Sequence, residues 1–209
     1  ADNGGAGSID VAGDSFRLFD SDGGGEFTNV ERFLDDASGD PTGGLGVGQT
    51  FSLQIDVNFR DGFKGVNIFD TDNATRIFNF ETSTDVDGSG TDGYVVQDAS
   101  VTDTGGTTIT TGNQLFDNAY AADTVFSLSL TQTASGSGSW TIDRSGGSTG
   151  SATGTYSGQI SKFELFTIGA GNADPENAIF YNNFSIVPEP AAGVLLLAGL
   201  GLLSLRRRR

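Results

Sequence analysis

Apolar and polar residues alternate strictly in the stretch TFSLQIDVNF, and this limits the folds open to the chain. The apolar members of the stretch are Phe51, Leu53, Ile55, Val57 and Phe59. A period of two is typical of a β-strand with one buried and one wet face, because successive side chains of a strand point to opposite sides. The stretch TVFSLSLTQT repeats the pattern through Phe126, Leu128 and Leu130. We therefore expect strands to build the core.

Shorter apolar runs indicate further strands at 16–19, 64–70, 76–82, 93–102, 107–111, 139–144, 159–168 and 178–187. Clusters of Gly, Ser and Asp at 87–93, 134–139 and 144–150 are typical of the turns between them. This spacing predicts an all-β domain over residues 1–187, a two-sheet antiparallel β-sandwich of the jelly-roll type. A helical turn is expected around 29–36, where the apolar residues have helical spacing.

Composition narrows the classes of function. Sixteen Phe, four Tyr and one Trp favour an ordered core, so we interpret the 32 glycines as turns. Residues 1–187 carry 26 acidic and 7 basic side chains, and a net charge of −19 disfavours nucleic acid as a partner. The absence of Cys and His excludes disulfides and thiolate nucleophiles and removes the usual general base. The chain starts at Ala1 without Met, and we expect that a secretory signal peptide has been removed.

The C-terminal 22 residues differ from the rest of the chain. Residues 191–205 contain no charge, and Arg206, Arg207, Arg208 and Arg209 follow them. A helix of this length covers roughly 22 Å, against about 30 Å of hydrocarbon in a bilayer. Arginines that reach the cytoplasmic interface make such a short transmembrane helix feasible and place the acidic domain outside.

Pro188, Glu189 and Pro190, a leucine-rich segment and a terminal basic cluster together resemble the PEP-CTERM sorting signal of Gram-negative bacteria. The resemblance implies an exported precursor that is held transiently in the inner membrane by residues 191–205, with its domain in the periplasm. It also implies cleavage of the tail by exosortase. The mature protein is then expected at the cell surface or outside the cell, in species that form biofilms and make exopolysaccharide.

The domain more loosely resembles concanavalin A-like and laminin G-type jelly rolls, through its strand pattern and the closing IFYNNFSIV. Glucanases that share such a fold carry a Glu-x-Asp-x-x-Glu strand motif, which is absent here. Glu81, Glu164 and Glu176 stand alone in the sequence, and we expect each to be solvated. The chain is therefore predicted not to be an enzyme.

Calcium is the one cofactor that the sequence suggests. In DSDGGGEFTNVE, the residues Asp20, Asp22, Glu26 and Glu31 occupy positions 1, 3, 7 and 12 of a loop that is similar to an EF-hand calcium loop. Asp85 and Asp87 match the first half of such a loop. The alternative interpretation is a pair of solvated acidic turns, which this composition also produces.

Two functions follow as hypotheses. The first is a non-catalytic, structural or carbohydrate-interacting component of the extracellular matrix, and the second is a calcium-stabilised lectin-like module. Sugar binding needs an exposed aromatic ring beside polar groups, and Tyr120 and Trp140 are the candidates. The alternation around Trp140 favours a core position for its ring.

Overall fold

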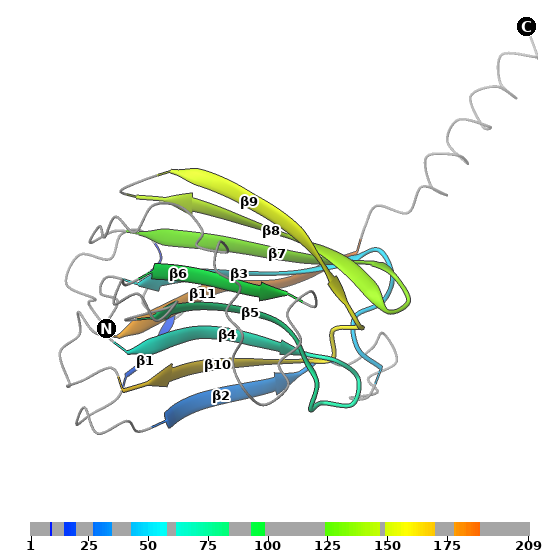
Figure 1. Ribbon diagram of the computed structural model, residues 1–209, viewed down its shortest axis with the longest axis horizontal. Helices are drawn as coiled ribbons and strands as arrows, with labels where there is room; N and C mark the ends of the chain where they lie inside the picture. Colours follow the sequence, from blue (N-terminus) through cyan, green and yellow to red (C-terminus); the bar gives the residue numbers. More distant parts are fainter. Residues whose placement is uncertain are drawn as a thin grey trace, which may run out of the picture.

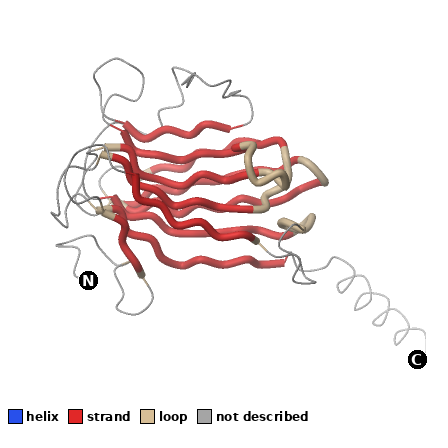
Figure 2. Tube along the Cα trace, turned by 90° about the horizontal axis from the view of Figure 1, so that it is seen from below, coloured by secondary structure: helices blue, strands red, loops and turns tan. Residues whose placement is uncertain are grey.

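The computed structural model describes residue 9 and residues 15–19, 27–34, 43–57, 62–83, 93–98, 124–146, 149–169 and 178–188. Within these ranges the chain forms two antiparallel sheets that pack face to face (Figures 1 and 2). The six-stranded sheet has the order β1-β11-β3-β7-β8-β9. Its strands are β1 (Phe16–Leu18), β11 (Ile179–Pro188), β3 (Gln49–Val57), β7 (Val125–Ala134), β8 (Ser137–Ser145) and β9 (Gly150–Ser157).

The five-stranded sheet has the order β2-β10-β4-β5-β6. Its strands are β2 (Phe27–Phe33), β10 (Lys162–Ile168), β4 (Phe63–Phe69), β5 (Arg76–Ser83) and β6 (Gly93–Asp98). The prediction of an all-β domain with two antiparallel sheets is confirmed. The described residues contain no helix long and apolar enough to cross a membrane, and the segment 191–205 lies outside them.

Two local predictions were wrong. The helical turn expected around 29–36 is strand β2, which pairs along its whole length with β10. These inter-strand hydrogen bonds outweigh a helical spacing of three apolar residues, because local propensity is a weak determinant against tertiary context. Strand β9 was not predicted, since its sequence GSATGTYS lacks an apolar alternation, but it pairs with β8 from Gly150 to Ser157. The strand expected at 107–111 lies outside the described residues.

The core lies between the sheets and is rich in aromatic rings. Phe126 from the six-stranded sheet contacts Phe80 and Tyr94 of the opposite sheet, with ring centroids 4.8 and 4.7 Å apart. Phe51 stacks on Phe163 across the same interface at 5.0 Å. Burial of each such ring contributes roughly 2–3 kcal/mol. These contacts fix which face of each strand points inward, and so which side chains reach the outer faces.

Candidate functional site

The outer face of the five-stranded sheet carries a continuous row of polar side chains. The register aligns one residue from each strand, namely Glu31, Glu164, Asn67, Asn79 and Gln97. Alternation produces this row, because the neighbouring residues of β4, β5 and β10 point into the core. All members except Glu31 are buried. We call these five residues the polar row.

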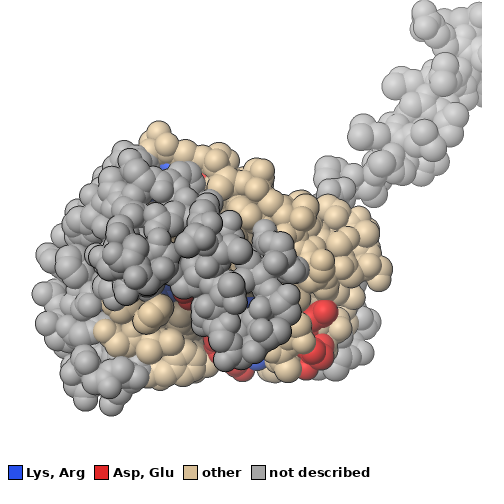
Figure 3. Space-filling view, viewed as in Figure 1, with Lys and Arg blue, Asp and Glu red and all other residues tan. Residues whose placement is uncertain are grey.

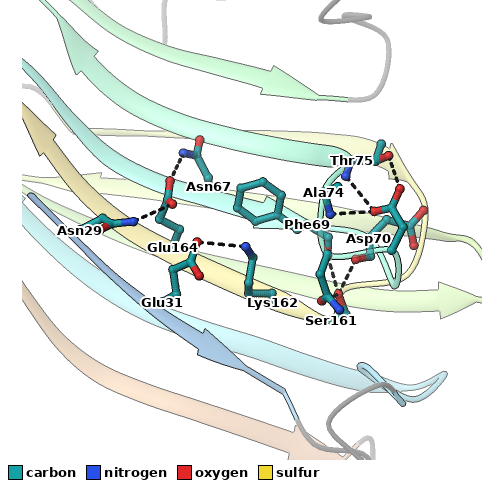
Figure 4. A network of polar contacts seen from close by, with 12 residues as sticks. Asn29, Glu31, Asn67, Phe69, Asp70, Ala74, Thr75, Ser161, Lys162 and Glu164 are labelled. Carbon is teal, nitrogen blue, oxygen red and sulfur yellow. Dashed lines mark hydrogen bonds and ion pairs between the residues drawn. The ribbon is translucent and has the colours of Figure 1, made fainter. Parts of the chain in front are cut away.

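Hydrogen bonds connect the central members of the polar row, and Figure 4 shows the part of this network on β2, β10 and β4. Asn67 Nδ2 donates to Glu164 Oε1 at 2.8 Å, and Asn29 Nδ2 donates to Glu164 Oε2 at 3.0 Å. Asn79 Nδ2 donates to Asn67 Oδ1 at 2.8 Å and to Glu81 Oε2 at 3.3 Å. Asn79 Oδ1 is buried and receives no hydrogen bond from the described residues. The row thus holds its side chains in place.

A buried carboxyl group lies next to the row, on β5. Burial raises the pKa of Glu81, and the positive charge of Arg76 and the hydrogen bond from Asn79 oppose the shift. Arg76 in turn donates from Nη2 to Gln97 Oε1 at 2.7 Å. The site therefore combines a carboxyl group that favours its neutral form with amide and guanidinium groups.

Lys162 occupies the other side of the polar row. Its Nζ atom lies 3.0 Å from Glu31 Oε1 and 4.2 Å from the centroid of the Phe69 ring, with the Phe33 ring at 5.9 Å (Figure 4). The hydrogen bond from Lys162 lowers the pKa of Glu31, whose side chain is 38% exposed. Lys162 thus lies near two aromatic rings and holds the Glu31 carboxylate at the solvent boundary.

Strand β2 forms the exposed edge of this face. Its outward side chains are Phe27, Asn29, Glu31 and Phe33, and all four are exposed. Phe63 of β4 is also exposed. It pairs with Ile168 of β10, which pairs with Phe27 on its other side. Aromatic rings thus bracket an amide and a carboxylate on a strand edge. Such a set can stack on an apolar face of a ligand and hydrogen-bond its hydroxyl groups.

Two of the predicted site residues, Trp140 and Glu31, lie in described strands. Trp140 is 6% exposed and packs against Phe78 with ring centroids 5.8 Å apart. It is therefore not the exposed platform considered for it, because its strand places the ring in the core. Glu31 lies within strand β2 and pairs with Lys162, and its role as a calcium ligand stays a prediction.

The remaining predicted ligands lie outside the described residues. These are Asp20, Asp22, Glu26, Asp85, Asp87 and Tyr120. No group of acidic side chains suited to a metal ion occurs within the described ranges. The calcium site and the sugar-binding role of Tyr120 stay predictions.

Sequence reasoning missed the polar row. Glu81 and Glu164 were expected to be isolated and solvated, yet both are buried and hydrogen-bonded on one face. Glu176 lies outside the described residues. The available signal was a polar residue at alternate positions of NVERF, VNIF and KFELF, but these stretches become neighbours only through the register.

The sorting motif begins at the end of a strand. Pro188 is the last residue of β11 and pairs with Gln49 of β3. Glu189, Pro190 and Arg206 to Arg209 lie outside the described residues. The boundary predicted after residue 187 lies one residue before the end of β11.

Comparison with known proteins identifies the C-terminal segment. Residues 187–209 match the model of the PEP-CTERM protein-sorting motif. None of the curated protein sequences matches the chain closely enough to count as a relative. The motif is a substrate signal for exosortase and marks an exported, membrane-processed protein, as the sequence predicted.

Three solved structures show a distant likeness. An alginate lyase from Alteromonas sp. 272 has a TM-score of 0.39 and 12% identity, over 66% of this chain and 70% of that one. The Caenorhabditis elegans galectin LEC-6 has a TM-score of 0.36 and 12% identity, over 81% and 96%. A scytalido-glutamic peptidase has a TM-score of 0.33 and 14% identity, over 79% and 76%. All three TM-scores lie below 0.5, and no activity is inferred from them.

Proposed function

We propose that this chain, which carries a PEP-CTERM protein-sorting motif, is a non-catalytic protein that interacts with carbohydrate in the extracellular polymer. Its precursor is anchored in the inner membrane by residues 191–205, with the domain in the periplasm. Exosortase then cuts near Pro188 to Pro190, and the domain moves to the cell surface or beyond. The domain is a sandwich of the jelly-roll type, since the strands from its two ends pair with each other, β1 with β11 and β2 with β10.

One observation carries the binding function, namely the exposed edge formed by Phe27, Asn29, Glu31 and Phe33 together with Phe63. Sugars present apolar ring faces edged by hydroxyl groups, and aromatic rings with adjacent amide and carboxylate groups match both features. Glu164 accepts a hydrogen bond from Asn29, and Lys162 donates one to Glu31. The buried part of the face therefore fixes the polar groups of its exposed edge, which lowers the entropic cost of binding.

A binding role is favoured over catalysis because the two carboxylates nearest the exposed edge are already engaged. Glu164 accepts hydrogen bonds on both carboxylate oxygens, and Glu31 is paired with Lys162. A general acid or base needs a geometry in which it can exchange a proton with the substrate. The corresponding test is incubation of the full chain with crude exopolysaccharide, from which we expect no release of reducing ends.

The binding test uses a glycan array and affinity electrophoresis in gels that contain exopolysaccharide. The variants Phe27→Ala and Phe33→Ala are expected to weaken retention about tenfold each, which corresponds to 1.4 kcal/mol. Phe19→Ala is the control, because Phe19 is an exposed aromatic residue that follows β1 and so belongs to the other sheet. Equal losses in all three variants, or retention of the wild type by no glycan, would contradict the proposed binding face.

The route is tested separately by mass spectrometry of the C-terminus of the native protein. We expect it to end near Pro188 to Pro190, since exosortase acts on this signal. A native protein that retains Arg206 to Arg209 would instead be a permanently anchored one. This measurement does not depend on whether the domain binds sugar.

A further inference from the structure

The folded domain ends almost at the predicted membrane segment. Val187 and Pro188, the first residues of the sorting motif, pair with Thr50 and Gln49 inside the six-stranded sheet. Only two residues then precede the uncharged segment 191–205. Two extended residues span at most about 7 Å, which is roughly the depth of one headgroup layer. A tail inserted in lipid therefore holds the end of β11 at the bilayer surface.

Exposed aliphatic side chains surround this strand end. Val47 lies in the turn before Gln49 and is 63% exposed, Val187 is 55% exposed and Ile186 is 43% exposed. We call Val47, Ile186 and Val187 the aliphatic rim. Three such side chains expose apolar surface to water, and its transfer into lipid is favourable.

The two segments that carry the aliphatic rim are uncharged. Residues 43–50 and 184–188, which carry the rim, contain no charged side chain, whereas Asp70, in the turn between β4 and β5, lies at the same end, where Gln159 links it to Gly43 and Leu45. Figure 3 shows mostly uncharged surface on the upper right of the described part, with acidic side chains below it on the same side. Anionic lipid headgroups repel carboxylates, so the uncharged rim is the part of this end that can approach them.

An apolar cavity of about 160 Å³ opens beside the rim, between the end of β2 and β11. Leu34, Phe51, Phe163, Phe184 and Ile186 supply its apolar lining, and Arg32 is the charged residue that lines it. A guanidinium group beside an apolar cavity suits a phosphate attached to a hydrocarbon chain. The cavity and the rim share Ile186, so they form one continuous surface.

We propose that the aliphatic rim and this cavity are a lipid-contacting surface, with which the anchored precursor rests on the membrane until its tail is removed. This inference rests on insertion of residues 191–205, which is part of the proposed function, and goes beyond it by assigning an orientation to the domain. Val47, Ile186 and Val187 contact the headgroup region, and Arg32 lies next to lipid phosphates. Loss of the tail leaves only this weak contact and releases the domain.

The test places a lipid-sensing probe at single positions of the full chain. Because the chain has no Cys, Val47→Cys, Val187→Cys and Phe19→Cys each give one labelling site for an environment-sensitive fluorophore. Phe19 is the matched control, since it is an exposed apolar residue beyond the start of β11, at the opposite end of the sandwich. The labelled chains are reconstituted into vesicles of phosphatidylethanolamine and phosphatidylglycerol, some with brominated acyl chains.

Flotation of the vesicles is measured first, and quenching by brominated lipid second. We expect the chain to float and the probes at 47 and 187 to be quenched several-fold more than the probe at 19. A chain that floats but shows equal quenching at all three positions, or none, overturns the lipid-contacting surface and leaves tail insertion intact. A chain that does not float overturns both.

Discussion

The two sheets share one core but present opposite kinds of outer face. On the six-stranded sheet one cross-strand row consists of hydroxyl groups, from Ser185, Ser52, Ser129, Thr141 and Thr153, and all five are at least partly exposed. The corresponding row of the five-stranded sheet is the polar row of amides and carboxylates, of which four members are buried. Both rows follow from the same alternation along the strands.

The two faces differ in whether water can take the place of a lost hydrogen-bond partner. Ser52 and Ser129 are linked at 3.2 Å on a face that water also reaches, so each hydroxyl can exchange its partner for water at little cost. Asn67 and Glu164 are linked at 2.8 Å where both are buried, and a lost partner there leaves a group unsatisfied. The five-stranded face therefore holds a fixed arrangement of polar groups, whereas the other face is adaptable. A fixed arrangement is what selective binding requires.

The largest effect is expected for Asn67→Ala, in the middle of the polar row. The change removes the donor to Glu164 and the acceptor of Asn79, and it leaves buried polar groups behind, so the free energy of unfolding should fall by about 2–3 kcal/mol. Urea denaturation followed by fluorescence of Trp140, the single tryptophan, measures it. Asn67→Asp should cost more, because it places a second carboxylate against Glu164.

A loss below about 0.5 kcal/mol for Asn67→Ala, the size typical of surface substitutions, would contradict a desolvated row. The two outer faces would then be energetically equivalent, and the comparison would fail.

A second, pH-dependent effect is expected at Glu81. Its folded-state pKa lies above the ordinary value of 4.5 because of burial, so folding favours the protonated form. Below pH 4.5 the raised pKa of Glu81 does not reduce the free energy of unfolding. As pH rises through the folded-state pKa, the free energy of unfolding falls. Glu81→Gln stays neutral and keeps an acceptor for Asn79, so this variant should be more stable than the wild type at pH 7 and equal to it near pH 4.

Glu31 supplies the matched control with the opposite sign. Its pKa lies below 4.5 because of the hydrogen bond from Lys162, so its contribution is present above pH 4.5 and is lost as pH falls through the folded-state pKa. Glu31→Gln should therefore be less stable than the wild type at pH 7, by about 1 kcal/mol or less, since the pair is partly exposed. Thermal unfolding of both variants between pH 3 and 8 separates the two signs, and parallel curves would contradict the assigned environments.

The strands could be predicted from the sequence more completely than the candidate site. Alternation in TFSLQIDVNF and TVFSLSLTQT predicted β3 and β7, because the side-chain period is a local property. Strand β2 was misinterpreted because Val30, Phe33 and Leu34 also fit a helix, and only its pairing with β10 decides between the two. The tail could be recognised because its three parts are contiguous.

The polar row could not be predicted in the same way. Glu164 and Asn67 are 97 residues apart, and Glu164 and Asn29 are 135 residues apart, so their contact depends on the strand order of the sheet. Each residue alone fits a solvated strand position. The order β2-β10-β4-β5-β6 is the information that the local pattern lacked.

The smallest effect is expected for Thr131→Val on the six-stranded face. Thr131 and Thr50 share a hydroxyl hydrogen bond of 2.7 Å, which is shorter than any of those measured within the polar row. Valine keeps the β-branched shape and removes only the hydroxyl, so we expect a change within about 0.5 kcal/mol, because water replaces the lost partner. Urea denaturation beside Asn67→Ala makes the comparison direct. If the two variants lose equal stability, the length of a hydrogen bond and not its burial determines the loss in free energy of unfolding. If Thr131→Val leaves stability unchanged, desolvation distinguishes the two faces.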